Sequence, residues 1–414
     1  MSRSRLRPLS AALALLLAPL AHAQQVITPK LSYTGEAAAM LGGGQDSGSA
    51  YAGQALIGMD LHLDQAVGWP GATLKAYVIN RHGTNLVNSS LGNSTSVQEI
   101  YGGQGTRLAN LTLEQSLLDG RLVLEAGRSI ANIHFLGSDL CQFFQGNSAC
   151  GNPTYVFRTS SFTWWPVSSW MADAKAWVTP QLYVHVGAYQ VDPSQAMDGE
   201  HGLRWSTSQA TGWIVPYAIG WQSAAGARHK AMYELGGWQD NAPYRDPLVD
   251  ADGTPAALSG LDYAGRHGRS GAYARFEQQV SGPDASHGLT LFGAVLKGTS
   301  GQLIEHWFAQ AGLVQKGTFA SRPQDDLALV VTRQQYSDDA LENLRLTRAV
   351  AGGTGTPPSG QTMMELSYGF AVNSHLRIAP SLHYVMHPDQ FNAPARAVDL
   401  PNAWVAGLRF DLNL

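Results

Sequence analysis

The sequence predicts an all-β protein whose strands close into a transmembrane antiparallel barrel, and three observations predict it. Apolar and polar side chains alternate with a period of two along most of the chain, which is the pattern of strands with one apolar face. After the first 23 residues, no apolar run approaches the ~20 residues that a transmembrane helix needs. The composition combines 45 glycines, 11 tryptophans and 15 tyrosines with only 14% charged residues, which favours strands, tight turns and an aromatic-rich surface.

The first 23 residues have the three parts of a secretory signal peptide. A basic start with three arginines (residues 3–7) is followed by an apolar run (13–20) and by the small-residue cleavage pattern Ala-His-Ala (21–23). The alternatives are a buried first helix or a membrane anchor, but the apolar run is too short to span a bilayer. The sequence therefore predicts a signal peptide at 1–23 and one barrel domain at 24–414, exported to the outer membrane of a Gram-negative cell.

The charge of the exported chain argues against nucleic acid as a partner. Removal of residues 1–23 takes away three arginines and no acidic residue, so the formal net charge moves from −4 to about −7. The chain shows no basic cluster of the kind that nucleic-acid binding requires. Outer-membrane lipid is the expected surrounding, and whether several barrels associate as a homo-oligomer is left open.

Sixteen segments with period-two alternation are the candidate strands. An even number suits a bacterial outer-membrane barrel, and closure is required because every backbone N–H and C=O in lipid must be paired internally. In order, the segments are 31–41, 51–63, 73–80, 107–115, 122–126, 171–178, 182–190, 212–221, 231–238, 272–277, 289–296, 307–313, 327–331, 362–370, 376–385 and 404–414.

Turn signals and apolar faces support these segments in order. The third strand is entered through Gly-Trp-Pro-Gly (68–71), and Asp119-Gly120 between the fourth and fifth is a strong hairpin signal. Thr-Pro-Gln (179–181) separates the sixth and seventh. The last strand alternates to the end of the chain, with Leu408, Phe410 and Leu412 on one side, as a strand that closes on the first one must.

The connections alternate between short and long, which predicts short periplasmic turns and long extracellular loops. The short ones include 118–120, 179–181 and 372–375, and the long ones 81–106, 192–211, 240–270 and 334–361. Loops of that length would count against a soluble domain. Within the last long loop, Leu341, Leu344 and either Thr347 or Arg348 share one face of a short predicted helix.

Segment 127–153 holds both cysteines of the chain and is predicted to fold inward as a constriction loop. It mixes apolar, polar and small residues without a helical period. Export makes a Cys141–Cys150 disulfide chemically reasonable, as a local clip rather than a framework. Zinc binding is the weaker alternative, because zinc needs four ligands and His134 alone does not complete the set. No metal or cofactor is expected.

Several segments, in this order, resemble the carbohydrate-selective porins of the glucose-porin type, over essentially the whole mature chain. They are DLHLD at 60–64 with GWPG at 68–71, TRL at 106–108 with LEQ at 113–115 and DGRL at 119–122, GR at 127–128 with Cys141 and Cys150, and LRIAPSLHYV at 376–385. The resemblance implies a sixteen-stranded barrel narrowed by inward-folded loops. It also implies passive, selective diffusion of small carbohydrates, such as glucose and related monosaccharides.

Charged residues near the predicted constriction are the first candidates for selectivity. Arg107 and Arg128 lie near the inward loop, and alternation places Glu114, Glu125 and Arg121 on the lumen side. Arg128 has the outward parity, so a bulge near Gly127 would be needed to turn it inward. The competing interpretation is that these are ordinary wall charges of an aqueous interior.

Phe143 and Phe144 are the aromatic candidates. They could offer a stacking surface for sugar rings, but adjacent aromatic residues in a folded loop more often anchor it to the wall. The pattern favours anchoring.

Three alternative functions stay open at the level of sequence. The first is a general diffusion porin of broad specificity. The second is an outer-membrane lipid hydrolase built on a barrel, which would need Ser381, His383 and a carboxylate to converge, although that face is predicted to be the lumen. The third is a soluble secreted lectin-like β-protein, which fractionation would distinguish.

Overall fold

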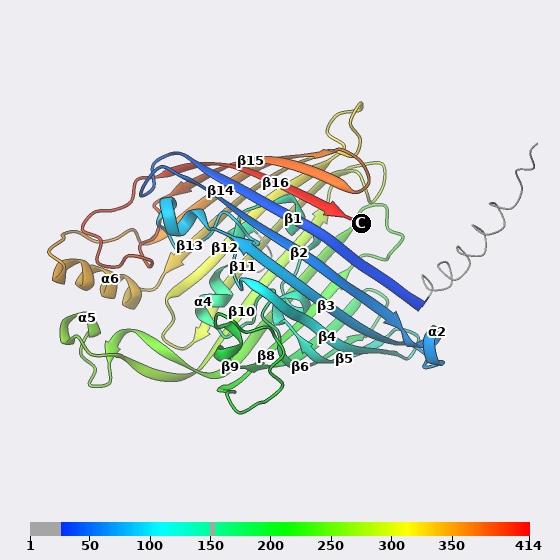
Figure 1. The fold of residues 1–414 in the computed structure, drawn as a ribbon, viewed down its shortest axis with the longest axis horizontal. Coiled ribbons are helices and arrows are strands. Elements are labelled where there is room, and N and C mark those ends of the chain that lie inside the picture. The colour runs from blue at the N-terminus through cyan, green and yellow to red at the C-terminus, as the bar shows by residue number, and fades with distance from the viewer. Residues whose placement is uncertain (1–25, 150–153) are drawn as a thin grey trace, which may run out of the picture.

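The computed structural model describes residues 26–149 and 154–414. Within these residues, sixteen antiparallel strands form a closed barrel in which each strand pairs with its neighbours in sequence (Figure 1). This confirms the predicted fold class. The strands are β1 Ile27–Gly42, β2 Ser49–His62, β3 Ala72–Gly83, β4 Gly105–Leu117, β5 Leu122–Ser129, β6 Ser169–Trp177, β7 Leu182–Val191, β8 Gly212–Gln222, β9 Ala231–Asp250, β10 Tyr263–Gln279, β11 Gly288–Ser300, β12 Glu305–Lys316, β13 Asp326–Tyr336, β14 Gly360–Ala371, β15 Leu376–Met386 and β16 Ala403–Asn413.

The barrel closes by pairing of its first and last strands. The register of β1 with β16 runs from Ser32 opposite Asn413 to Gly42 opposite Trp404, with one irregularity near Met40. Closure leaves neither strand with an unpaired edge, as a barrel in lipid requires.

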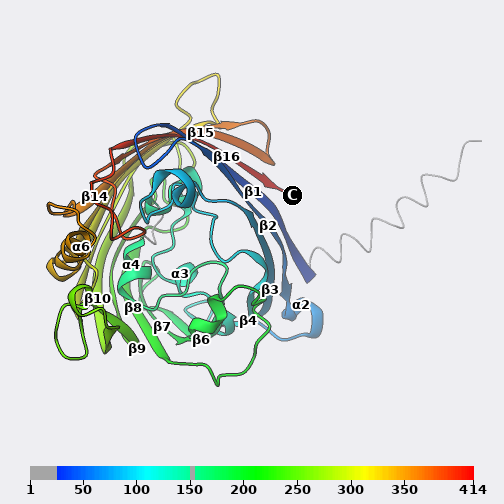
Figure 2. The ribbon, with the colours of Figure 1, turned by 60° about the vertical axis from the view of Figure 1, so that its left-hand side comes forward.

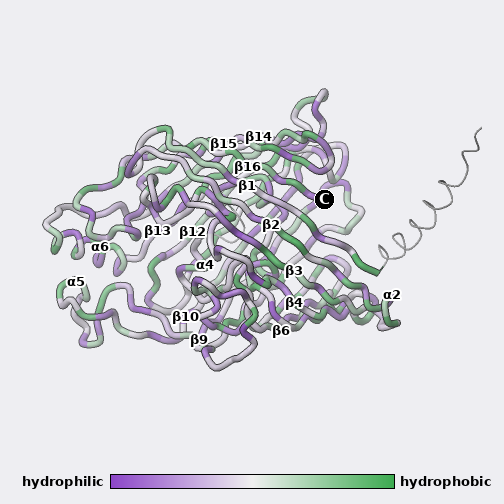
Figure 3. Tube along the Cα trace, in the orientation of Figure 1, coloured by the Kyte–Doolittle hydropathy of each residue, from purple (hydrophilic) through white to green (hydrophobic). Residues whose placement is uncertain are grey.

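The outward face of the wall is apolar and carries aromatic side chains. In β8 the exposed side chains Trp213, Tyr217, Ile219 and Trp221 alternate with buried, inward ones. Figure 3 shows the corresponding mixture of hydrophobic and hydrophilic positions along the strands. Among the described residues, none of the helices has the length and apolarity that a transmembrane helix requires.

Turns are short at one end of the barrel, and most connections at the other end are long, with 43–48 and 301–304 as the short exceptions. At the turn between β4 and β5, Leu118, Asp119 and Gly120 all have positive φ (54°, 56° and 82°), which is the backbone of a tight hairpin. The short helices of the connections are α2 Leu63–Val67, η1 Val87–Leu91, α3 Ala131–His134, η2 Asp139–Phe143, η3 Asn147–Ala149, α4 Thr154–Thr159, η4 Pro193–Ala196, α5 Ala256–Ser259 and α6 Asp338–Val350.

The long connection expected at 240–270 is largely paired strand. Strands β9 and β10 continue as a paired ribbon from the wall out to Asp250 and Tyr263, and only α5 and its flanking residues connect them. Beyond the membrane neither face of a strand has to be apolar, so the period-two signal disappears although the pairing continues. The helix predicted in the last long loop is α6, and its Leu344 and Arg348 are buried.

The lumen is filled unevenly by the segment between β5 and β6. Figure 2 shows this segment, with α3 and α4, inside the ring of strands. Its apolar side packs against the inner faces of β6 to β12. The buried cluster includes Phe135, Tyr155 and Phe162 from the segment, and Tyr189, Ile214, Trp238, Leu296 and Phe308 from the wall.

Candidate pore constriction

The segment between β5 and β6 is clamped to the wall at residues 143–146. The Glu365 carboxylate accepts hydrogen bonds from the backbone N–H groups of Gln145 and Gly146 at 2.7 and 2.8 Å. The Ser367 hydroxyl donates to the Phe143 carbonyl at 2.6 Å, and the Arg409 guanidinium to the Phe144 carbonyl at 3.2 Å. Strands β14 and β16 thus fix the apex of the loop inside the barrel.

A second loop, residues 84–104 between β3 and β4, pairs with this apex through the backbone. The Glu99 N–H donates to the Gln145 carbonyl at 2.9 Å, and the Asn147 N–H donates to the Ser96 carbonyl at 3.0 Å. The Gln98 side chain donates to the Glu36 carbonyl at 3.0 Å. Two loops distant in sequence therefore form one constriction.

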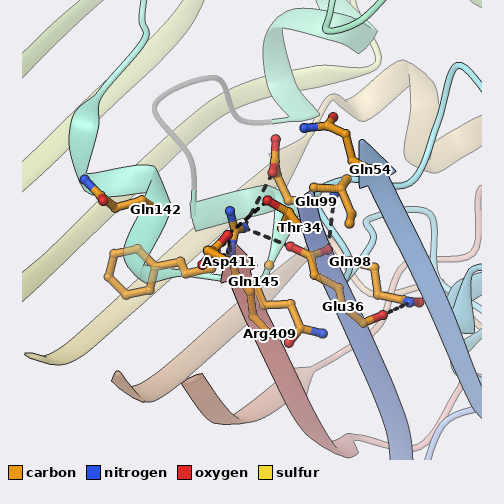
Figure 4. Close-up of polar contacts among 12 residues, drawn as sticks. Thr34, Glu36, Gln54, Gln98, Glu99, Gln142, Gln145, Arg409 and Asp411 are labelled. Atoms are coloured by element: carbon orange, nitrogen blue, oxygen red, sulfur yellow. Dashed lines mark hydrogen bonds and ion pairs between the residues drawn. The ribbon is translucent and has the colours of Figure 1, made fainter. Parts of the chain in front are cut away.

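A network of charged side chains lies where the two loops meet the seam of β1 and β16 (Figure 4). Arg409 contacts Glu36 at 2.9 Å, Asp411 at 3.0 Å and Glu99 at 3.8 Å. Glu36 is fully buried, whereas the side chains of Arg409, Asp411 and Glu99 are 11%, 16% and 31% exposed. We call these four residues the seam network.

Arg377 extends the charged surface along the neighbouring strand β15. It pairs with Asp326 at 2.5 Å and donates to the Gln142 carbonyl at 3.2 Å. Its side chain is 17% exposed. Paired charges of this kind present both donors and acceptors, which suits hydroxyl groups better than it suits a free ion.

Sequence reasoning missed the seam network, although one signal pointed to it. Arg409 and Asp411 occupy the inward positions of the last strand, two residues apart, which alternation alone places on the lumen side. Glu99 lies in a long loop without any periodic pattern. Its position could not be read from the sequence.

The structure places Glu114 and Glu125 on the inner wall, opposite one another in β4 and β5. Lys75 contacts both, at 2.6 and 3.2 Å. Arg121 lies at the turn before β5, exposed, with its guanidinium donating to the Leu118 carbonyl at 3.3 Å. Arg121 therefore lies at the end of the barrel and away from the seam network.

Arg128 lies on the outward side of the wall, under segment 192–211. The register of β5 runs through Gly127 without a bulge and sets Arg128 opposite Trp170. Arg128 is fully buried. It donates to the Arg204 carbonyl at 2.7 Å and to the Gln195 side chain at 3.0 Å.

Arg107 holds the same segment from β4. It is 2% exposed, and it donates to the carbonyls of Gln195 and Met197 at 2.8 and 3.0 Å. Because β5 leaves the wall to enter the lumen, part of the edge of β4 has no strand beside it. Segment 192–211 covers this edge, where the Leu108 N–H donates to the His201 carbonyl at 2.8 Å. The geometry gives Arg107 and Arg128 the role of closing the wall.

Phe143 and Phe144 are 5% and 2% exposed and pack with Phe292, Val314 and other apolar wall residues. These contacts hold the loop against β11 to β13. Cys141 lies in the same loop, but Cys150 lies outside the described residues, so the disulfide remains a prediction. Trp164, in the same segment, is more exposed than either phenylalanine, at 36%, and the centre of its ring lies 5.7 Å from that of the Phe157 ring.

A cavity of about 890 Å³ opens below the constriction loop. Its wall includes Glu99 and Trp165 at one end and the turns at 222–231 and 285–288 at the other. Among the described residues, no group of three or more His, Cys, Asp or Glu side chains could hold a metal ion.

A closed antiparallel barrel whose own loops narrow the lumen around paired charges is the architecture of an outer-membrane porin. The family model described as carbohydrate-selective porin, OprB family, matches residues 46–414. The chain belongs to this family and is accordingly a sugar porin of the outer membrane.

Individual relatives agree with this assignment. The chain is 34% identical over 398 residues to "Porin B" of Pseudomonas aeruginosa, a match covering 92% of this chain and 86% of the relative. It is 23% identical over 409 residues to "Putative porin QuiX" of Acinetobacter baylyi, covering 92% and 88%. A solved structure of Pseudomonas putida OprB at high pH superposes with a TM-score of 0.87 at 29% identity, covering 96% of both chains.

Proposed function

We propose that the seam network is the selectivity filter for small neutral carbohydrates, glucose and related monosaccharides among them. A sugar hydroxyl can both donate and accept a hydrogen bond. The partly exposed Arg409 guanidinium offers donors, and the neighbouring carboxylates of Asp411 and Glu99 offer acceptors. Trp165, which lines the same cavity as Glu99, supplies aromatic surface for the C–H faces of the ring. Binding through partly exposed, paired groups is weak enough for release, and transport follows the concentration gradient.

The observation that carries this proposal is the meeting of both loops with the barrel seam at Arg409. The test is planar-bilayer conductance of the purified protein, titrated with glucose. We expect glucose to reduce the current in the wild type, and Arg409→Gln to raise the half-blocking concentration about tenfold, the equivalent of one charge-assisted hydrogen bond.

Arg333→Gln is the matched control, because it removes the same charge from β13, where Arg333 donates to the Gly360 carbonyl away from the lumen loops. A current that does not respond to any sugar would favour a general diffusion pore. Equal half-blocking concentrations of glucose in Arg409→Gln and Arg333→Gln would show that Arg409 is not part of the filter.

A hydrolase site at Ser381 and His383 is the second candidate, since the Ser381 hydroxyl lies 3.0 Å from His383 Nε2. Glu365 lies 3.7 Å from His383 Nδ1, which is too long for a hydrogen bond, and both its oxygens already bind the constriction loop. His383 is 2% exposed. We propose a non-catalytic role, which lipid hydrolysis abolished by His383→Ala would contradict.

Two further proposals involve at least one residue outside the described part of the chain. Residues 1–23 are proposed to be removed on export, and Cys141 and Cys150 to form a disulfide that fixes the shape of the constriction loop. Mass spectrometry of the outer-membrane protein, with and without reduction, measures both.

A further inference from the structure

We propose that the cavity below the constriction is a second binding site, for monosaccharides that carry an anionic group. The site lies on the exit side of the filter and is formed by the side chains of Lys175, Lys230 and Lys316, which all line the cavity. We call them the vestibule lysines. The inference rests on the proposed function only in taking sugars as the class of solute.

The first observation is that the vestibule lysines have no carboxylate partner. Among the described residues, Lys30 and Lys75 are the lysines that form ion pairs, and none of the three vestibule lysines does so. In the seam network, by contrast, the Arg409 charge is matched by three carboxylates. In the filter the carboxylates therefore outnumber the guanidinium, whereas the vestibule holds three ammonium groups without an ion-pair partner.

Two of the four acidic residues of the cavity wall, Glu99 and Glu234, form ion pairs with arginines. Glu234 accepts from Arg275 at 2.7 Å, from Tyr183 at 2.5 Å and from Tyr273 at 3.0 Å. Glu277 accepts from the Ser138 hydroxyl at 2.6 Å. This hydrogen bond leaves the charge of Glu277 unbalanced, so among the described residues Glu277 and Asp139 are the two carboxylates of the cavity wall without an ion-pair partner, against three vestibule lysines.

Aromatic rings hold two of the lysines in place. The Lys175 ammonium lies 3.9 Å from the centre of the Tyr183 ring and 5.1 Å from that of Trp177. The Lys316 ammonium lies 4.9 Å from the centre of the Phe143 ring. A ring face attracts a cation without neutralising it, so these ammonium groups keep their charge and N–H donors for a solute.

The chemistry that fits is a sugar with one carboxylate or phosphate. Its hydroxyls satisfy the paired groups of the filter, and its anionic group then finds the unpaired ammonium groups below. A cavity of about 890 Å³ is within the usual range of small-molecule sites. The neutral sugar passes through the same cavity without this attraction.

The experiment compares blockade of the bilayer current by gluconate, glucose 6-phosphate, glucose and inorganic phosphate. In the wild type at 0.1 M salt, we expect both sugar anions to block at concentrations about three- to tenfold lower than glucose. The difference should shrink at 1 M salt, where the Debye length falls to about 3 Å. Inorganic phosphate should block less well than glucose 6-phosphate.

The variant Lys230→Gln with Lys316→Gln should remove the preference and leave glucose blockade unchanged, which also shows that the barrel is folded. Lys297→Gln is the control, since Lys297 is an exposed residue of the outward face of β11. Equal blockade by gluconate and glucose in the wild type, a preference that survives the double variant, or phosphate acting as well as the sugar anions would each overturn the site. A wild-type current that gluconate blocks and glucose does not block would instead contradict the proposed function.

Discussion

Glu365 shows how much of the constriction depends on one wall side chain. Its carboxylate accepts two backbone N–H groups of the loop while being 3% exposed, so it compensates for donors that the loop cannot satisfy internally. Hydrogen bonds to a charged group contribute about 1.5–3 kcal/mol each. The loop's position is thus set by wall residues as much as by the loop itself.

We predict that Glu365→Gln loosens the loop without unfolding the barrel. The amide keeps the size of the carboxylate but has one acceptor oxygen, so one N–H loses its partner. Single-channel recordings should show higher open-channel noise and larger conductance. Glu114→Gln, which alters the pair with Lys75 on the wall, is the control, and a quiet current in Glu365→Gln would contradict the clamp.

At the level of the individual residue, the sequence predicted some positions and could not predict others. The inward positions of Glu114 and Glu125 follow from alternation along regular strands. The seam network does not follow, because Glu36, Glu99 and Arg409 are distant in sequence and meet only through barrel closure and loop folding. The burial of Arg107 and Arg128 depends on segment 192–211, which has no periodic signal.

At the scale of the elements, segment 192–211 has a structural role that its sequence does not indicate. It covers the edge of β4 that is exposed when β5 leaves the wall. The carbonyl of Arg204 is bound by Arg128, whose guanidinium also lies 5.6 Å from the centre of the Trp205 ring. The peptide bond after Arg204 is therefore held in the structure.

We predict that Arg128→Ala makes this bond sensitive to trypsin. Loss of the buried contacts should allow the segment to open locally, and cleavage after Arg204 should be about tenfold faster, as expected for roughly 1.4 kcal/mol of lost local stability. Mass spectrometry of timed digests measures the rate. Arg266→Ala, a change in the β9–β10 ribbon, is the control, and unchanged cleavage at Arg204 would show that Arg128 does not hold the segment.

A second prediction concerns the element that narrows the lumen. Changing Cys141 and Cys150 together to Ser should leave the barrel folded, because the proposed disulfide joins two residues of the loop and no wall strand, but should alter conductance or sugar preference. Heat-modifiability on gels checks folding and bilayer recording checks transport. Unchanged transport would count against a shaping role for the disulfide.

The elements also show where strand patterns stop being informative. All sixteen strands could be located because each has an apolar outward face. In β6 to β12 part of the inward face is apolar as well, since side chains such as Trp238 and Phe308 pack against the inserted segment. There, alternation locates the strand but does not tell which inward positions face water and which pack against the inserted segment.

At the scale of the whole molecule, the periplasmic turns are tied to neighbouring strands. Asp325, in the turn before β13, is 1% exposed and accepts from Arg322 at 2.8 and 3.0 Å, from the Tyr368 hydroxyl at 2.9 Å and from the Ala371 N–H at 3.0 Å. The hydrogen bonds from Arg322 are the main cause that lowers the pKa of Asp325 below its ordinary value of 3.8.

This pKa predicts the direction of a pH effect. A carboxylate with a lowered pKa in the folded state stabilises the barrel at pH values above 3.8, and the contribution is lost as the pH falls through the lower, folded value. Asp325→Asn should therefore reduce resistance to urea in detergent at pH 7 and have little effect at the lowest pH at which the wild type remains folded. An equal loss at both pH values would contradict the charge as the cause.

The seam network joins the two ends of the chain, and this has a consequence for biogenesis. Glu36 is on the first strand and Arg409 on the last, and these strands become neighbours only when the barrel closes. In an assembling chain with an open seam, Glu36 lacks its ion pair with Arg409. Under the proposed function, selectivity is acquired at the final step of insertion, and a barrel arrested before that step would be a leak rather than a slower version of the mature channel.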